Sequence, residues 1–508
     1  MGNDQLKLLL INPPVLLPVG FKPVLPPPLS LAYLASALSR FDIFEVFLYD
    51  CMLDDNFESV SDDFIYWGKK TEAIETYLKE TQPDIVAITG VYSAQEEIVV
   101  QVCKIVKKVS EELNKKILTI IGGALATALP EQLLSNLEVD FAIIGEGEYS
   151  LYQLCRALSN DESIINIKGL GFRDFTDKVI QNTNTDFLDD LDAIPFPAYN
   201  LLDVEYYAKR SWYGGDLKKH HFAPIVLSRG CDEKCIHCLV PKIFGKSRLR
   251  SPQNIIEEME LLYRRYGIRE FHFQTSQFFL NLVWAKSLLK ALKSTDMKIS
   301  WTFHNPVVFG EFDAELVNLM KDTGCYQVWL DMGSGNQSFL TDNLQRPGDL
   351  NRFKQLVKSL NSHGIKVNAF FQLGWPGENK EQIRKTIKFA IRLKLNQLIF
   401  QPSAPVPGTQ LWEICQNKKY LPADFKLSDL IKENALIITK DFNPKEIDWF
   451  IEYAKFQLNL RNILSNPIKL ISACFRNLLL LIRSPKKFGQ DLQKIIRLWK
   501  ERVKDEVF

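Results

Sequence analysis

Short apolar runs alternate with longer amphipathic stretches along the first 160 residues of the chain. The runs lie at residues 6–11, 43–49, 85–89, 117–121 and 141–144. Apolar positions at helical spacing fill the stretches between them, for example residues 29–38 and 96–113. Five short strands separated by helices predict a doubly wound parallel α/β sheet of the Rossmann-like kind. In such a sheet, ligands bind beyond the carboxyl ends of the strands.

The loops expected after four of these strands are rich in glycine, proline and hydroxyl residues. In chain order they carry Asn12 and Pro13, then Thr89 and Ser93, then Gly122, Gly123 and Thr127, and then Gly145, Glu146, Gly147 and Glu148. Glycine lets the backbone approach a ligand closely, and hydroxyls and free amides hold polar groups. Each loop alone is typical of an ordinary turn. Four such loops at one edge of a sheet indicate a ligand site.

A second alternation begins at residue 223, after a polar, proline-containing stretch that we interpret as a linker. Its expected strands are residues 223–227, 270–273, 298–303, 326–330, 366–371 and 397–400, with helical patterns between them. Six strand–helix units predict a partial (β/α)6 barrel of the TIM type, whose site would lie at the carboxyl ends of the strands. The expected division is a sheet domain at 1–160, a linker at 161–222, a barrel at 223–415 and a helical domain at 416–508.

Charge and cysteine usage narrow the class of protein. The formal net charge is +1, and no nucleic-acid motif occurs, so we expect no nucleic-acid partner. The chain has nine cysteines and no recognisable signal peptide, which favours reduced thiols in the cytoplasm. No run of 18 apolar residues occurs, so we expect no membrane-spanning helix.

The last part of the chain, residues 461–508, is strongly basic, with eleven Lys or Arg against four Asp or Glu. Together with its apolar helical faces, this composition fits a segment that lies on an anionic membrane surface. A basic helical subdomain packed on the barrel is the plainer interpretation. Peripheral membrane contact through this tail, and a lipophilic substrate, are the expectations that follow from the first interpretation.

Three cysteines, Cys231, Cys235 and Cys238, form the strongest chemical motif. They lie on one loop directly after the first barrel strand, with three and then two residues between them. Thiolates suit iron–sulfur clusters or zinc. A structural zinc site needs four closed ligands, and His237 is poorly placed to be the fourth. Three ligands on a four-iron cluster would instead leave one iron open.

This CxxxCxxC loop, after the first strand of a six-unit barrel, resembles that of the radical S-adenosylmethionine superfamily. The resemblance implies a 4Fe-4S cluster whose open iron chelates S-adenosylmethionine, which is cleaved to methionine and a 5′-deoxyadenosyl radical. It also implies that His237 packs near the adenine. Further residues assigned by the resemblance to the S-adenosylmethionine side are Asp331, Ser334, Gly374, Pro376 and Gly377. No residue is assigned a catalytic role.

The first half resembles the cobalamin-binding domain that precedes the barrel in one branch of this superfamily. A matching segment in this half is Ile144-Gly145-Glu146-Gly147-Glu148. In the barrel, Leu373-Gly374-Trp375-Pro376-Gly377-Glu378 also fits the branch, and the likeness spans about residues 5–415. It implies that the glycine and hydroxyl loops named above hold cobalamin. The branch includes methylases and the anaerobic cyclase of chlorophyll biosynthesis.

Three departures from the branch pattern stand out. Leu125 replaces a histidine that many members carry in the glycine loop, and leucine cannot ligate cobalt. Thr275-Ser276 lies in the loop that usually carries an acidic pair. Gly333 stands at the place of a glutamate that helps to hold S-adenosylmethionine, with Asp331 two residues away as a substitute.

The resemblance implies a cobalamin-dependent radical enzyme that transfers a methyl group to an unactivated carbon of a small molecule. An oxidative, ring-forming enzyme with the same cofactors stays open, as does a catalytically reduced accessory protein that only binds the cluster. By resemblance, flavodoxin or ferredoxin supplies the electron.

Overall fold

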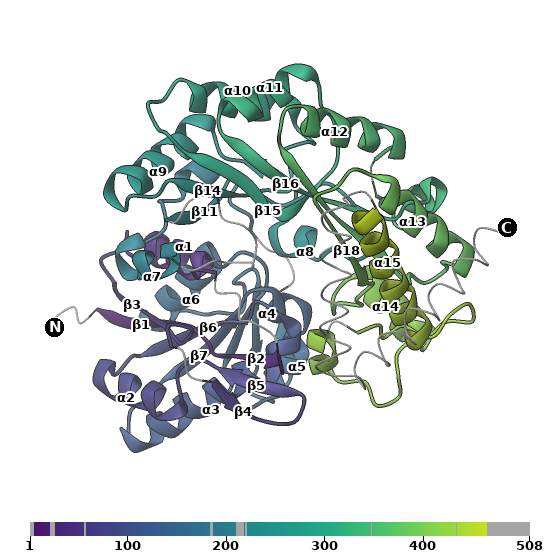
Figure 1. The fold of residues 1–508 in the computed structure, drawn as a ribbon. Helices are drawn as coiled ribbons and strands as arrows, with labels where there is room; N and C mark the ends of the chain where they lie inside the picture. Colours follow the sequence, from purple (N-terminus) through teal and green to yellow (C-terminus); the bar gives the residue numbers. More distant parts are fainter. Residues whose placement is uncertain are drawn as a thin grey trace, which may run out of the picture.

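Two parallel sheets organise the protein, one in each half of the chain (Figure 1). This computed structural model describes residues 5–20, 26–54, 57–182, 186–209, 218, 221–346, 348–432 and 434–464. The sheets lie side by side, so that loops of the first unit face loops of the second.

The N-terminal sheet has seven strands in the order β10-β9-β8-β7-β6-β1-β3. Its five parallel strands match the five predicted ones and are β1 (Leu6–Asn12), β3 (Phe44–Asp50), β6 (Ile85–Thr89), β7 (Leu118–Gly122) and β8 (Phe141–Ile143). The strand order reverses at β1, which has β3 on one side and β6 on the other. This reversal is the switch point at which doubly wound sheets bind ligands.

Both faces of the N-terminal sheet are covered by helices, which explains its uninterrupted apolar strands. Leu8 and Leu10 pack with residues of α1 (Leu29–Leu38) and α6 (Gly147–Ser159) on one face. Leu9 and Ile11 pack with α2 (Thr71–Thr81) and α3 (Glu96–Glu112) on the other. Because successive residues of a strand point to opposite faces, a strand buried on both sides must be apolar at every position.

Several short elements were not predicted. β9 (Leu170–Arg173) and β10 (Val179–Gln181) extend the N-terminal sheet in antiparallel fashion. They lie within residues 161–222, so the interpretation of that whole stretch as a linker was wrong for these two strands. A small separate sheet joins β2 (Val15–Pro18), β5 (Phe64–Trp67) and β4 (Phe57–Ser59). Strands this short carry too few positions for an alternating pattern to be recognised.

The second half forms an open sheet of six parallel strands in sequential order, which we call the barrel sheet. They are β11 (Phe222–Val226), β14 (Glu270–Gln274), β15 (Ser300–Val308), β16 (Cys325–Gly333), β17 (Lys366–Leu373) and β18 (Gln397–Pro402). The intervening helices include α9 (Pro252–Arg265), α10 (Leu282–Lys293), α11 (Ala314–Asp322), α12 (Leu350–Ser362) and α13 (Lys380–Arg392). β11 and β18 do not pair with each other, so the predicted partial barrel is confirmed.

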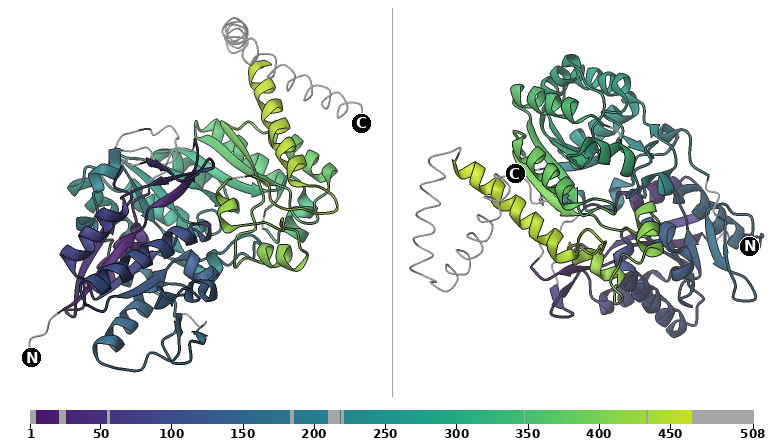
Figure 2. Two further views of the ribbon diagram at one scale, coloured as in Figure 1. Left: turned by 90° about the horizontal axis from the view of Figure 1, so that it is seen from below. Right: turned by 90° about the vertical axis from the view of Figure 1, so that its right-hand side faces the viewer.

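The C-terminal part packs against the open edge of the barrel sheet. After α14 (Gln410–Asn417), helix α15 (Pro444–Leu464) lies along β18 and α13 (Figure 2). The helix thereby covers an edge strand, whose unpaired backbone groups would otherwise invite association. None of the helices within the described ranges is both long and apolar enough to cross a bilayer. Most of the basic tail, residues 465–508, lies outside the described residues, so its predicted membrane contact stays a prediction.

Candidate functional site

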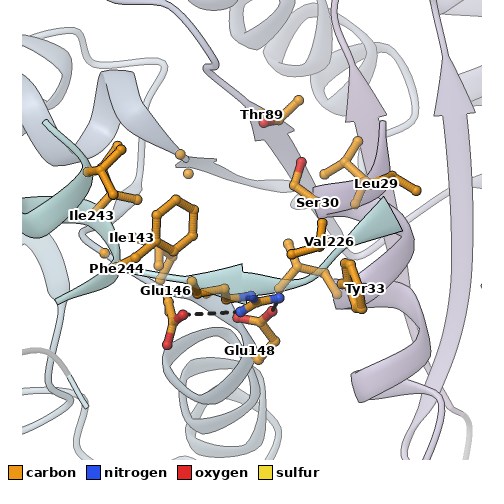
Figure 3. Close-up of a pocket in the computed structure, with 18 of the residues that line it drawn as sticks. Leu29, Ser30, Tyr33, Thr89, Ile143, Glu146, Glu148, Val226, Ile243 and Phe244 are labelled. Carbon is orange, nitrogen blue, oxygen red and sulfur yellow. Dashed lines mark hydrogen bonds and ion pairs between the residues drawn. The ribbon is translucent and has the colours of Figure 1, made fainter. Parts of the chain in front are cut away.

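A cavity of about 450 Å³ lies between the carboxyl ends of the strands of the N-terminal sheet and the carboxyl ends of the first strands of the barrel sheet, β11 and β14. Predicted cofactor-binding residues that line it are Thr89, Gly122, Gly123, Gly145, Glu146, Gly147 and Glu148. In Figure 3, Ile243 and Phe244 face Leu29 and Ser30 across the cavity, and Glu148 lies toward its base. The cavity is therefore shared by loops that are distant in the sequence.

The glycine loops form one wall of the cavity. A Cβ placed on Gly122 would meet no heavy atom closer than 4.0 Å, so this wall is open where a side chain would stand. Gly123 has a φ of +91°, a backbone conformation that favours glycine. The Thr127 hydroxyl donates to Gly123 O over 2.9 Å and accepts from Gly145 N over 3.0 Å. Thr127 thus joins the two glycine loops from behind rather than lining the cavity.

Other predicted residues of this set lie outside the cavity wall. Asn12 donates from Nδ2 to Asp50 Oδ1 over 2.8 Å, and neither Pro13 nor Ser93 lines the cavity. Leu125 is fully buried in the apolar core between the sheet, α2 and α3. A Cβ on Gly90 would stand only 2.7 Å from the Leu125 Cβ, so this side chain is tightly packed against the backbone.

The three cysteines lie on a loop that is closed at its base, residues 230–247, which we call the cluster loop. The base is a short antiparallel pair, β12 (Ser228–Arg229) with β13 (Arg248–Leu249). Gly230 has a φ of +74°, and a Cβ there would collide with Lys246 O across the base. Cys231 N donates to Gly245 O over 3.2 Å. The loop therefore begins and ends at a narrow neck between β11 and α9.

Hydroxyl groups after β14 also hold this neck. Thr275 Oγ1 lies 2.7 Å from Ser228 Oγ, and Ser276 Oγ donates to Gly230 O over 2.9 Å. Both residues line the cavity. Thr275 and Ser276 stand where the branch usually has its acidic pair, and here they bind the cluster loop instead.

Four charged side chains join the neck to the glycine loop after β8, and we call them the ion-pair cluster: Glu146, Glu148, Arg229 and Arg248. Arg229 lies 3.2 Å from Glu146 and 2.7 Å from Glu148, and Arg248 holds both Glu146 oxygens at 2.8 and 2.9 Å. All four side chains are at most 10% exposed. Burial alone would lower the pKa of Arg229, but Glu148 and Glu146 raise it above its ordinary value.

Another buried arginine, Arg346, lies beside the cysteines. Burial raises the pKa of Cys235 to about 11 and that of Cys238 above its usual value, and the Arg346 charge acts against both shifts. Arg346 donates from Nη1 to Asp331 Oδ2 and from Nη2 to Asp331 O, each over 2.9 Å. Asp331 is therefore part of an ion pair, which sequence reasoning did not foresee.

His237 meets the loop after β17. Its ring centroid lies 5.2 Å from that of Trp375. The buried His237 Nδ1 and Trp375 Nε1 have no hydrogen-bond partner among the described residues. Glu378 shapes this loop, because its Oε2 accepts from Gly374 N over 2.9 Å and from Trp375 N over 3.3 Å.

The remaining residues predicted on this side have different environments. Gly374 and Gly377 both have positive φ, at +84° and +88°, within the turn that also contains Pro376. Ser334 is fully buried, with its Oγ 3.1 Å from Thr386 Oγ1. The structure thus brings His237 to the loop of Gly374 and Pro376, while Ser334 is held by a helix residue.

These donors fit the implied cofactors. Three thiols lie on one loop beside a buried guanidinium, which offsets the negative charge of a thiolate-bound iron–sulfur cluster. Within the described ranges, no three His, Cys, Asp or Glu side chains converge on a single metal ion. The orphaned nitrogen atoms of His237 and Trp375 suit a ligand with its own hydrogen-bonding edge. The glycine wall suits a large ligand that approaches the backbone.

Comparison with known proteins agrees with this geometry. The family model of the radical SAM superfamily matches residues 225–390, and that of the B12 binding domain matches residues 23–154. An uncharacterized methyltransferase of Pyrococcus horikoshii is 30% identical over 438 residues, which cover 86% of this chain and 88% of that protein. The cytidylyl-2-hydroxyethylphosphonate methyltransferase of Streptomyces wedmorensis is 27% identical over 463 residues, or 85% of each chain.

A solved structure shows that the fold is shared as well. The cobalamin-dependent S-adenosylmethionine radical enzyme OxsB, with aqua-cobalamin and S-adenosylmethionine bound, superposes with a TM-score of 0.71 at 14% identity. The match covers 99% of this chain and 80% of that one. By these likenesses, the chain belongs to the cobalamin-binding branch of the radical S-adenosylmethionine superfamily.

Proposed function

We propose that this protein is a cobalamin-dependent radical S-adenosylmethionine methyltransferase that acts on an unactivated carbon of a small molecule. The observation that supports this proposal best is the shared cavity. The glycine loops of the region that matches the B12 binding domain form one wall, and the neck of the cluster loop, in the region that matches the radical SAM superfamily, forms the other. When bound, the cluster and S-adenosylmethionine supply a deoxyadenosyl radical, and cobalamin supplies a methyl group. The protein has to hold these groups around one substrate.

On the barrel side, Cys231, Cys235 and Cys238 would hold the cluster. The charges of Arg346 and Asp331 suit the carboxylate and the ammonium of the methionine end of S-adenosylmethionine. His237 and Trp375 would contact the adenine through their rings and free nitrogen atoms. In this assignment, the Arg346–Asp331 pair replaces the glutamate that the branch usually supplies.

On the cavity side, Thr89 and the backbones of Gly122, Gly123, Gly145 and Gly147 would hold cobalamin. Leu125 offers no ligand to cobalt, so this loop would leave the lower face of the corrin without a protein ligand. An unligated lower face would suit the role of bound cobalamin as a methyl donor. Four other residues of the predicted set, Asn12, Pro13, Ser93 and Thr127, would act by shaping the loops.

Apolar side chains make up much of the rest of the wall, among them Leu29, Ile143, Val226, Ile243 and Phe244. They would keep water away from a ligand held in the cavity, which suppresses side reactions. We further propose that residues 1–160 and 223–415 act as the two cofactor domains. The electron would come from a flavodoxin or a ferredoxin.

Anaerobic reconstitution tests the function. The protein would be loaded with iron, sulfide and hydroxocobalamin, analysed for both metals, and then given reductant, S-adenosylmethionine and candidate small molecules. A methyltransferase binds about one cobalt and four irons and forms both S-adenosylhomocysteine and 5′-deoxyadenosine. Deoxyadenosine without S-adenosylhomocysteine or methylated product would instead favour the ring-forming reaction. A cluster with neither product, across the candidates, would contradict an enzyme role.

A further inference from the structure

The ion-pair cluster has a place in the fold that a stabilising contact alone does not require. Glu146 and Glu148 extend from the loop whose Gly145 and Gly147 line the cavity. Arg229 and Arg248 are the last residues before and the first after the cluster loop. The four charges therefore connect the cavity wall to both ends of the loop that carries the three cysteines.

The two arginines are direct partners in the short ladder between β12 and β13. Like charges opposite each other on paired strands repel, so anions beside this neck stabilise it. The anions come from a different unit of the fold, 83 residues away for Arg229 and 102 for Arg248. Two carboxylates balance two guanidiniums in a site that excludes most water, where ion pairs are strong and directional.

Each arginine has a further anchor that limits independent movement. Arg248 donates to Leu188 O over 2.6 Å and to Phe244 O over 2.5 Å, and its guanidinium lies 5.4 Å from the Phe187 ring. Arg229 lies over the Tyr33 ring at 5.2 Å. A shift of the Glu146–Glu148 loop on ligand binding would then change the ion pairs that hold the neck.

We propose that Glu146, Glu148, Arg229 and Arg248 are positioning residues that couple filling of the cavity by cobalamin to the geometry of the cluster loop. This inference rests on the proposed function, because it needs cobalamin in the cavity. Coupling between two sites is reciprocal, so an assembled cluster must also tighten cobalamin binding. Glu146 and Glu148 then act through the arginines rather than as cobalamin contacts.

The test measures the dissociation constant of hydroxocobalamin by absorbance, on full-length protein stripped of iron and on the same protein with its cluster restored. We expect cluster assembly to tighten binding about fivefold or more in the unaltered protein, the lower range of typical coupling. In Glu146→Met/Arg248→Met the ratio should fall, because the paired apolar replacement removes every contact of Glu146 and leaves only the Arg229–Glu148 pair between the two units, while avoiding an unpaired charge at Arg248. Each variant is its own reference, so a direct effect of the new side chain at position 146 on cobalamin is separated from the coupling.

The matched control is Glu311→Met/Arg352→Met, which removes an exposed two-contact pair, at 2.6 and 2.8 Å, that does not line the cavity. It should keep the ratio of the unaltered protein. Should the first double variant not fold, Glu148→Gln removes one charge at nearly constant volume and should lower the ratio at least threefold. Iron content and thermal unfolding confirm that the compared proteins are folded and loaded.

The outcomes separate the inference from the proposed function. A ratio near one in the unaltered protein, or an unchanged ratio in Glu146→Met/Arg248→Met, would overturn the coupling while cobalamin binding stands. Loss of coupling in the exposed control as well would also overturn it, because the effect would then not depend on this cluster. Failure of the unaltered protein to bind cobalamin in either form would overturn the proposed function itself.

Discussion

The guanidinium of Arg346 lies 3.2 Å from the point where a Cβ on Gly333 would stand. The same guanidinium is held by Asp331, two residues earlier on β16. A side chain at 333 would therefore crowd Arg346, whose end would have to shift to admit it. The glycine at the place of the branch glutamate leaves this room to the buried arginine.

Gly333→Glu, which restores the branch glutamate, should lower both the stability of the protein and its affinity for S-adenosylmethionine. The φ of Gly333 is +77°, and a side chain in that conformation costs about 1–3 kcal/mol. The new carboxylate would also compete with Asp331 for Arg346, so we expect weaker binding of S-adenosylmethionine. Thermal unfolding and equilibrium dialysis measure the two effects. Gly333→Ala carries the backbone strain without the charge, and equal affinities in both variants would refute the competition.

Removing the charge of Arg346 should affect both the cluster and its ligand. Arg346→Gln leaves Asp331 without its cation and takes a positive charge from beside Cys235 and Cys238. Reduction adds negative charge to the cluster, so the midpoint potential should become more negative, by roughly 50 mV, close to a tenfold change for one electron. Binding of S-adenosylmethionine should weaken at least tenfold, as for a lost charge-assisted contact of about 1.4 kcal/mol.

An EPR-monitored redox titration and a binding isotherm provide these two numbers. Arg346→Lys keeps the charge but loses the two-pronged geometry, so it should keep the potential and lose part of the affinity. If Arg346→Gln leaves both quantities unchanged, the assignment of Arg346 to the site is wrong.

Glu378 should make stability depend on pH. Burial raises the pKa of its carboxyl to about 8, against the backbone N–H groups of Gly374 and Trp375, which lower it. An unfolded glutamate titrates near pH 4.3. Between about pH 4.3 and 8, the folded protein therefore retains a proton that the unfolded chain has already released. The contribution of this group to the free energy of unfolding is thus fully present below pH 4.3 and decreases as the pH rises. It is lost above about pH 8 and no longer changes there.

Glu378→Gln keeps the shape of the protonated side chain and removes this titration. The free energy of unfolding of the variant should match that of the unaltered protein near pH 5. Above that, the variant should become more stable than the unaltered protein by about 1 kcal/mol per pH unit up to pH 8. Chemical unfolding at pH 5, 7 and 9, with both proteins in the same cluster state, measures the difference. Glu381→Gln is the exposed comparison, and parallel curves for Glu378→Gln and the unaltered protein would speak against the raised pKa.

Local pattern was enough for elements with a continuous run or a helical spacing of apolar positions. Residues 85–89 and 29–38 were predicted with the bounds that β6 and α1 have, because every position of β6 is buried and α1 buries Leu31, Ala35 and Leu38 on one face. β9 escaped prediction, since it has four residues, one of them Gly171. Its place is set by pairing with β8, a long-range contact that no local pattern records.

The residues of the site also fall into those that local sequence indicated and those whose role depends on a distant partner. The cysteine spacing and the glycine loops are local, and the sequence indicated them. Arg229, Arg248 and Arg346 were missed because each acquires its role from a carboxylate supplied by another segment, as when Arg248 meets Glu146. The one available signal was Glu146 and Glu148 themselves, since two acids in a loop predicted to be enclosed at a ligand site need cations beside them when they are buried.

Leu125→His should fail to create a cobalt ligand, although it restores the residue that many branch members carry. Leu125 is fully buried in the core beside α3 and packs against Gly90, and it does not line the cavity. An imidazole there loses the leucine packing and buries a polar group, for a loss of about 2–5 kcal/mol. To reach cobalt, the histidine would have to leave the core and open the glycine loop. The EPR spectrum of bound cob(II)alamin reports this directly, since a nitrogen ligand splits the cobalt lines into triplets. We expect no such splitting in Leu125→His or in the volume control Leu125→Met. Splitting in the histidine variant alone would contradict this prediction. It would mean that the loop rearranges easily and that the unligated lower face depends on this one substitution.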